Sequence, residues 1–201
     1  MEPVPLLTHI QSRRSIRKYQ QRPVPQAVIE RVLEAARWGP SAHNRQPWRF
    51  TVLTKQQHRS DLADAMAARL QADLRADGVD EDIITADTGR SQARLKNAPV
   101  VIVVSMTMAD MDRYPDERRQ HFEWVMATQS VAMAAQNLLL MAHAEGLGAV
   151  WMCAPLFCPE TVREVVGIPA GLEPQGIVAM GYPAQERTRT REPLSSRVVF
   201  R

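Results

Sequence analysis

Three arginines and a serine stand together near the start of the sequence, in the run Arg-Arg-Ser-Ile-Arg over residues 13–17. Guanidinium groups donate paired hydrogen bonds to phosphate oxygens, and a hydroxyl adds another donor. A run of this kind is usually the solvated end of a helix when it stands alone. Its density of donors also suits a bound phosphate, and the residues further along the chain decide between the two interpretations.

A tight polar turn comes next, over residues 40–50. It reads Pro-Ser-Ala-His-Asn-Arg-Gln-Pro and runs directly into the Trp-Arg-Phe that begins an expected strand. By itself such a segment is most often only a loop. Following the arginine run at this spacing, it favours one shared ligand site over two unrelated surface features.

Together the two segments resemble the signature of the nitroreductase family of FMN enzymes, and the resemblance extends along nearly the whole chain. In that family the first segment grips the ribityl phosphate, and the second contributes to a flavin pocket shared between two subunits. The resemblance therefore implies the following phosphate-binding residues: Arg13, Arg14, Ser15 and Arg17. It also implies the following residues close to the flavin: Ser41, Ala42, Asn44 and Gln46.

The segment Trp151–Leu156 carries the resemblance further, because it is similar to the family segment that lies over the flavin. It follows an expected strand, at a turn where backbone N–H groups are exposed. The resemblance implies that Met152, Cys153 and Ala154 contact the cofactor. Because Ala154 has no side-chain donor, a hydrogen bond from it to flavin N5 would come from its amide.

The tail supplies a second set of cations. Arg191 begins an Arg-Glu-Pro-Leu run that resembles the tail segment that returns to the phosphate in family members. Arg187 and Arg189 would form a row with it if the tail is extended, because residues two apart then face one side. A solvated basic arm explains each of those two equally well.

Hydrophobic periodicity predicts the elements that position these residues. Helices are expected over residues 25–38, 56–76, 81–96, 118–145 and 159–166, and strands over residues 48–53, 100–105, 149–153 and 176–181. Helices and strands alternate without repeats or linkers, which predicts a single domain over residues 1–201 of the α+β class, a mixed α/β sandwich. The resemblance implies the nitroreductase-like fold, a central mixed sheet flanked by helices, in an intertwined homodimer with a C-terminal arm.

The expected helix at 118–145 bears on that dimer. It is apolar nearly all round from Val131 to Met141, a pattern that only deep burial tolerates. In a chain of 201 residues such a helix suits a dimer interface. Its most apolar stretch is shorter than the ~20 residues that a membrane span needs, so no membrane association is expected.

Several other kinds of site are not expected. Cys153 and Cys158 lack C-x-x-C spacing, which favours structural thiols, and no H-E-x-x-H or other metal-ligand pattern occurs, so no metal site is predicted. The net charge is +3, but the arginines cluster at the two chain ends rather than along a face with stacking aromatics, which argues against a nucleic-acid partner. Residues 1–5 show no signal-peptide pattern, which predicts a cytoplasmic protein.

The resemblance implies an FMN-dependent oxidoreductase that passes hydride from NAD(P)H through the flavin to a small organic acceptor, nitroaromatic or quinone-like, by a ping-pong route. The absence of a G-x-G-x-x-G fingerprint indicates that NAD(P)H docks transiently on the flavin. Hydride transfer needs mainly orientation and electrostatics from the protein, so no catalytic acid or base is expected, and His43 is predicted to be a pocket wall.

Three alternatives stay open. Similar sequences include biosynthetic flavoenzymes, of the flavin-fragmenting or deazaflavin-cofactor reductase type. The second alternative is a flavin-binding protein without turnover. The third is a basic binding module that holds no flavin.

Overall fold

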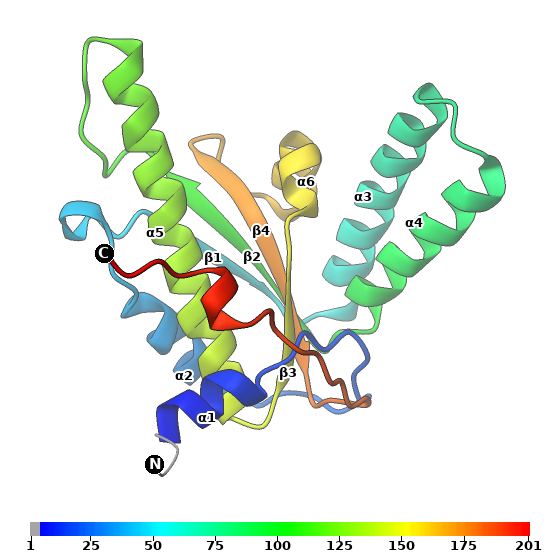
Figure 1. Cartoon of the computed structure of the whole chain (residues 1–201). Coiled ribbons are helices and arrows are strands. Elements are labelled where there is room, and N and C mark those ends of the chain that lie inside the picture. Colours follow the sequence, from blue (N-terminus) through cyan, green and yellow to red (C-terminus); the bar gives the residue numbers. More distant parts are fainter. Residues whose placement is uncertain (1–4) are drawn as a thin grey trace.

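A four-stranded antiparallel sheet forms the middle layer of the protein, as a computed structural model that describes residues 5–201 shows (Figure 1). Residues 1–4, part of the segment searched for a signal peptide, lie outside the described residues. The strands, in sheet order, are β1 (Trp48–Leu53), β2 (Val100–Thr107), β4 (Leu172–Gly181) and β3 (Gly148–Met152). The helices are α1 (Pro5–Ser12), α2 (Gln26–Arg37), α3 (Gln56–Ala76), α4 (Glu81–Lys96), α5 (Glu117–Ala144) and α6 (Pro159–Val166). Short 3-10 turns are η1 (Ala42–Asn44), η2 (Ala154–Phe157) and η3 (Leu194–Ser196).

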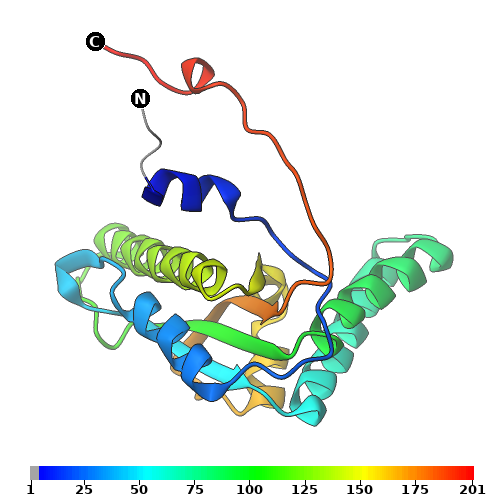
Figure 2. The ribbon, with the colours of Figure 1, turned by 90° about the horizontal axis from the view of Figure 1, so that it is seen from below.

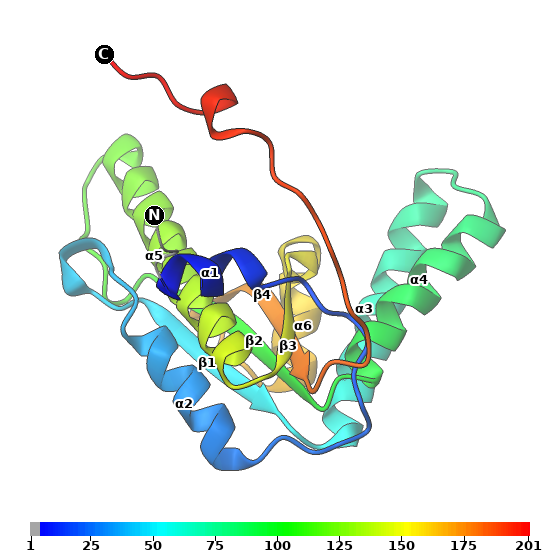
Figure 3. The ribbon, with the colours of Figure 1, turned by 60° about the horizontal axis from the view of Figure 1, so that its bottom comes forward.

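The central strand β2 is buried along its whole length and divides the core in two. Successive side chains of a strand point to opposite faces. Accordingly Ile102 and Val104 pack in one hydrophobic cluster with residues of α2 and α5. Val101 and Val103 pack in the other, with residues of α3, α4 and α6. The sheet is thus covered on both faces, and the α3–α4 hairpin projects beyond the second one (Figure 3).

The α+β class expected from the sequence is confirmed. Helices α3 and α4 begin and end at the predicted residues, whereas Pro25 is the N-cap of α2 rather than its first residue. All four strands pair antiparallel, and a parallel pairing occurs as an isolated bridge between Ser15, which lies outside the four strands, and Ala149.

Two features differ from the expectation. Strand β4 begins at Leu172 rather than Gly176, because the register shifts at Val104/Ser105 in β2, and such a bulge accommodates Pro174. Helix α1 was not predicted. None of its residues is buried within one chain, whereas the predicted helices were recognised by the apolar positions that they bury in the core.

Helix α5 lies lengthwise on the sheet (Figure 1). Among the described helices it is the one long and apolar enough, by length and composition, to cross a membrane. Its face with Ala127, Val131 and Leu138 is nonetheless buried in the core. A helix that packs in a protein core can meet the same criteria of length and composition, and α5 is such a helix in this fold.

The sheet also sets a testable limit on packing. A Cβ atom at Gly176 would collide with the indole ring of Trp151, so Gly176→Ala should lower the free energy of unfolding by about 1–3 kcal/mol. A Cβ atom added at Gly89 in α4 would meet no other atom within 4 Å. Gly89→Ala should therefore raise the free energy of unfolding by roughly 0.5–1 kcal/mol. Urea denaturation compares the two variants, and a change of the same sign in both would contradict the packing of Trp151 on β4.

Candidate functional site

Backbone hydrogen bonds attach the segment of residues 15–20 to two other parts of the chain. The Ile16 amide donates to the Ala149 carbonyl of β3 over 3.1 Å. Further on, the Gln20 amide donates to the Tyr182 carbonyl (2.9 Å), and the Ala184 amide donates to the carbonyl of Lys18 (3.0 Å). The beginning of the chain therefore runs beside the start of its tail.

Close packing fixes this segment in place. A Cβ atom at Gly148 would lie 2.6 Å from the Ile16 side chain, so only glycine permits the observed approach. The Tyr19 hydroxyl is buried within hydrogen-bond distance of the carbonyl oxygens of Ile16 (2.7 Å) and Ala179 (2.8 Å). Burial raises the pKa of Tyr19, against the nearby charge of Arg17, so the hydroxyl keeps its proton and remains a donor.

The result is a cavity of about 230 Å³, here named the arginine cradle. Its lining comprises Arg13, Arg14, Ser15, Arg17, Arg187, Arg189 and Arg191. Among the described residues 5–201, no carboxylate lines it. The structure thus brings the run at 13–17 together with Arg191, and also with the two tail arginines that a solvated arm would explain equally well.

Arg14 connects the two parts of the cradle. Its guanidinium donates to the carbonyls of Gln11 (2.5 Å) and Arg13 (2.8 Å), and also to that of Arg189 in the tail (3.2 Å). Burial lowers the pKa of Arg13, and the charges of Arg191 and Arg14 lower it further. The cradle therefore concentrates like charges that a bound anion would relieve.

Helix α1 is held beside the cradle by contacts that the sequence did not reveal. The His9 side chain lies 2.9 Å from the Leu140 carbonyl, and the Ser12 hydroxyl lies 2.8 Å from Nε2 of His143. The two imidazole rings stack with centroids 4.7 Å apart. Burial lowers the pKa of His143, with smaller contributions from His9, Arg13 and Arg14, so the neutral imidazole is favoured at this contact.

The polar turn predicted at the second motif is present, with an unusual backbone. His43, Asn44 and Gln46 all have positive φ angles, of 49°, 54° and 51°. Non-glycine residues rarely adopt this conformation, and such strain clusters at functional sites. The Ser41 hydroxyl accepts a hydrogen bond from the Gln46 amide over 3.0 Å, which helps to hold the turn.

Helix α5 supports this turn through a residue that sequence reasoning missed. The Ala42 amide donates to the Ser130 hydroxyl over 3.2 Å, and that hydroxyl donates to the Met126 carbonyl over 2.7 Å. Ser130 is buried. The signal that could have identified it is a lone serine at the start of an otherwise apolar stretch.

The third group of residues predicted to contact the flavin lies at the end of β3. Met152 is half-buried, whereas Cys153 and Ala154 are exposed. Ala154 begins η2, a position where the first N–H groups have no partner within the helix. Cys158 is buried, and burial raises the pKa of its thiol, as a structural role requires. Cys153, in contrast, is exposed, and its sulfur accepts a hydrogen bond from the Trp151 indole N–H over 3.0 Å.

Within one chain the predicted residues do not form a single site. The turn at residues 41–46 lies on the far side of α5 from the cradle (Figures 1 and 3). Within residues 5–201, no group of three or more His, Cys, Asp or Glu side chains is placed to hold a metal ion.

Comparison with known proteins identifies the family. The Nitroreductase family matches residues 10–182. The chain belongs to the nitroreductase family. Membership confirms the resemblance on which the expected class of protein, a flavin-dependent oxidoreductase, was based.

Individual relatives cover nearly the whole chain. A Thermus thermophilus NADH dehydrogenase is 32% identical over 214 residues, which cover 94% of this chain and 92% of that protein. A Methanothermobacter thermautotrophicus protein named as an NADH dehydrogenase or NAD(P)H nitroreductase is 33% identical over 182 residues, 90% of this chain and 78% of the relative.

Solved structures of similar fold also cover nearly the whole chain. A Desulfovibrio desulfuricans nitroreductase crystallised with FMN superposes with a TM-score of 0.77 at 29% identity, covering 100% of this chain and 98% of that one. A BluB-like flavoprotein of Clostridium difficile has a TM-score of 0.79 at 21% identity, covering 98% of this chain and 99% of that one, a likeness that concerns the fold alone.

Proposed function

We propose that this nitroreductase-family chain is an FMN-dependent NAD(P)H oxidoreductase whose arginine cradle binds the flavin phosphate. The observation that carries the proposal is the convergence of six arginines and Ser15 on one cavity, with no carboxylate from the described part of the chain in its lining. A phosphate dianion needs several charged donors from different directions, and this set supplies them. The Desulfovibrio relative, which contains FMN, supports the same ligand.

When bound, FMN would supply the hydride chemistry between NAD(P)H and a small nitroaromatic or quinone-like acceptor, in a ping-pong route. The chain's own residues bind and orient. Arg13, Arg17 and Arg191 would neutralise the phosphate, and Met152, Cys153 and Ala154 would hold the ring system, with the Ala154 amide as a hydrogen-bond donor to it. No side chain is assigned as an acid or base, and exposed His43 acts as a wall of the pocket.

A homodimer completes the pocket in this proposal. The turn with Ser41, Ala42, Asn44 and Gln46 lies away from the cradle of its own chain, so it would serve the cradle of a second copy. The surfaces that a partner would cover are apolar and exposed: Leu6, Leu7 and Ile10 of α1, Met133 of α5, and Val198, Val199 and Phe200 of the tail. The tail itself runs away from the body (Figure 2). We place this dimer in the cytoplasm.

A biosynthetic flavoenzyme is the alternative within the family. The BluB-like structure shares the fold at 21% identity and does not favour that chemistry for this chain. A transient NAD(P)H site agrees better with the relatives named for NADH dehydrogenase or NAD(P)H nitroreductase activity.

Absorption spectroscopy tests the proposed function. The purified protein is expected to be yellow, with about one FMN per chain, because the cradle offers one dianion site. Anaerobic addition of NADH or NADPH should bleach the flavin absorption. A colourless protein that also fails to bind added FMN is a basic module, and a yellow protein that neither nucleotide bleaches binds flavin without turnover. Either result contradicts the proposal.

The phosphate assignment has its own test. Arg13→Ala should weaken FMN binding by about tenfold or more, since a charged hydrogen bond contributes roughly 1.5–3 kcal/mol. Arg75→Ala is the matched control, because Arg75 pairs with Glu81 at the far end of the α3–α4 hairpin, and it should leave FMN affinity unchanged. Fluorescence titration of the apoprotein measures both constants. Equal affinity in the two variants would remove Arg13 from the site.

Light scattering tests the dimer. The protein is expected at twice the mass of one chain, and a permanent dimer of this kind buries above ~2,000 Å². A variant that ends at residue 191 keeps the cradle arginines but loses the apolar residues of the tail, and it should dissociate at a higher concentration than the full chain. A monomeric full chain that holds FMN would refute the shared pocket.

A further inference from the structure

A second and larger cavity adjoins the arginine cradle. Its volume is about 630 Å³, and it lies between the C-terminal half of α4, the segment at residues 17–21 and the start of the tail. We name it the α4 cavity. Arg17 and Arg187 line both cavities, so the α4 cavity begins where the cradle ends.

The α4 cavity is strongly basic, and among residues 5–201 no acidic side chain lines it. Its charged lining residues are Arg17, Lys18, Arg90, Arg94 and Arg187. Arg90 pairs with Asp87, whereas Lys18 forms no ion pair within the part of the chain that the structure describes. The dipole of α4 accounts for Arg94 in its last turn, but not for Lys18, which lies on another segment.

A hydrogen-bond donor without a partner lies at the same place. The side-chain nitrogen of Gln185 is shielded from solvent and has no hydrogen-bond partner among residues 5–201. Buried polar groups in proteins nearly always have a partner, so an unpaired donor at a cavity wall indicates a ligand that accepts hydrogen bonds. Gln185 lines the α4 cavity next to Arg187. The charges and this donor together favour an anionic ligand.

The flavin phosphate does not account for these cations. Four of the six cradle arginines do not line the α4 cavity, and their charge already exceeds that of a phosphate dianion. Lys18, Arg90 and Arg94 line only the α4 cavity. They therefore face a second anionic group.

Helix α4 extends from this cavity to the residues proposed to hold the flavin ring. Ser91 of α4 lines a smaller pocket of about 90 Å³ together with Ala154, whose amide is the proposed donor to the ring system. Met66 and Phe157 give this small pocket apolar walls. The residue before Ser91 is Arg90, which lines the α4 cavity. A flat substrate that reaches the ring beside Ala154 therefore meets apolar surface at one end and the cations of α4 at the other.

We propose that the α4 cavity holds an anionic group of the hydride acceptor, so that the protein prefers a flat aromatic acceptor that carries a carboxylate. This inference rests on the proposed function, because the acceptor must reach a flavin ring beside Ala154. Lys18 and Arg90 contact the carboxylate in this arrangement. With para-nitrobenzoate the reaction balances as a two-electron step: NADPH and one proton supply the hydrogens, one nitro oxygen leaves as water, and para-nitrosobenzoate and NADP⁺ are formed.

The reoxidation half of the reaction, measured alone, tests this preference. FMN-loaded protein is reduced photochemically, without a nicotinamide nucleotide, and is mixed anaerobically with para-nitrobenzoate or with para-nitrobenzamide. The amide has nearly the same shape as the carboxylate but no charge. Stopped-flow absorption follows the return of the flavin colour and gives a second-order rate constant for each acceptor. Salt of about 0.02 M leaves the interactions between charges largely unscreened.

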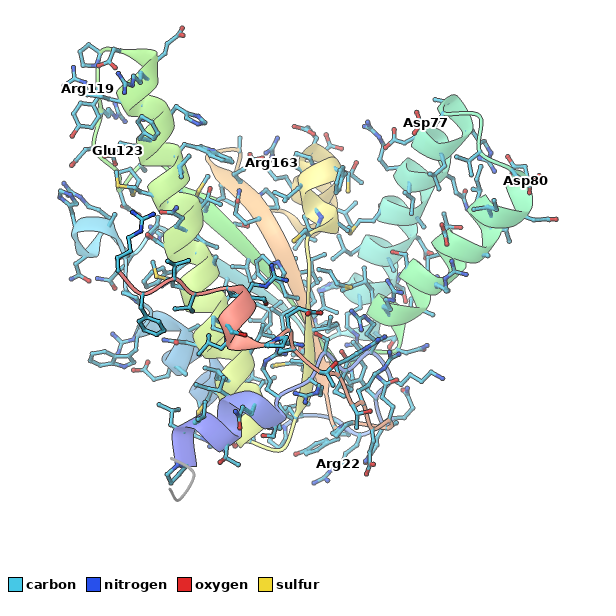
Figure 4. The ribbon with its side chains drawn as sticks, viewed as in Figure 1. Arg22, Asp77, Asp80, Arg119, Glu123 and Arg163 are labelled. Atoms are coloured by element: carbon cyan, nitrogen blue, oxygen red, sulfur yellow. The ribbon has the colours of Figure 1, made fainter. Side chains whose placement is uncertain are left out.

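Two variants are compared with the wild type. The double variant Lys18→Gln/Arg90→Gln removes two cations that line the α4 cavity and not the cradle. Arg75→Gln is the control, because it removes a cation near the tip of the α3–α4 hairpin, where Asp77 and Asp80 lie (Figure 4).

The wild-type rate constant for para-nitrobenzoate is expected to exceed that for para-nitrobenzamide. The ratio of the two constants should fall about fivefold or more in the double variant, since two partly exposed charge contacts are lost. Arg75→Gln should keep the wild-type ratio. An unchanged ratio in the double variant, or an equal loss with both acceptors, overturns the proposal.

Bleaching of the oxidised flavin by NADH and by NADPH tests whether the anion belongs instead to the nucleotide donor. If the double variant slows bleaching by NADPH but keeps the acceptor ratio, the α4 cavity holds a phosphate of the donor. The inference is then wrong, and the proposed function stands. If the wild type holds no flavin, or if neither nucleotide bleaches it, the proposed function itself fails, and this inference with it.

Discussion

The pairing of residues 15–20 with β3 and with the chain after β4 is the constraint on which the rest of the site depends. It joins segments that are far apart in the sequence, through the amides of Ile16, Gln20 and Ala184. Gly148 and the buried Tyr19 hydroxyl leave this segment little freedom to move. Without that pairing, the arginines at the two ends of the chain would have no common cavity.

Bringing those arginines together opposes folding unless an anion is present. The lowered pKa of Arg13 reflects both its burial and the repulsion from Arg191 and Arg14. A ligand that binds only the folded state stabilises that state by mass action. Packing of Ile16 and Tyr19 therefore holds the cradle in a geometry that its own charges oppose, and a bound phosphate would convert this repulsion into attraction.

Local periodicity was enough to predict much of the fold. Helices α3 and α4 and strand β1 begin and end where the sequence indicated, because each depends on spacings within a few turns or residues. The bulge that admits Pro174 into β4 and the docking of α1 through His9 depend on distant partners, which spacing does not reveal.

The candidate site likewise contains residues that could be predicted from the sequence and residues that only the structure identifies. Resemblance to the family identified Arg13, Arg14, Ser15, Arg17 and Arg191. The structure brings these residues together, whereas Arg187, Arg189 and Ser130 required the structure. Arg187 and Arg189 lie on a tail with no secondary structure of its own at those positions. That tail supplies cradle arginines first and exposed apolar residues a few positions later. In the proposed dimer one segment therefore contacts both the cofactor and the second subunit, so each of the two binding events lowers the entropy cost of ordering the tail for the other.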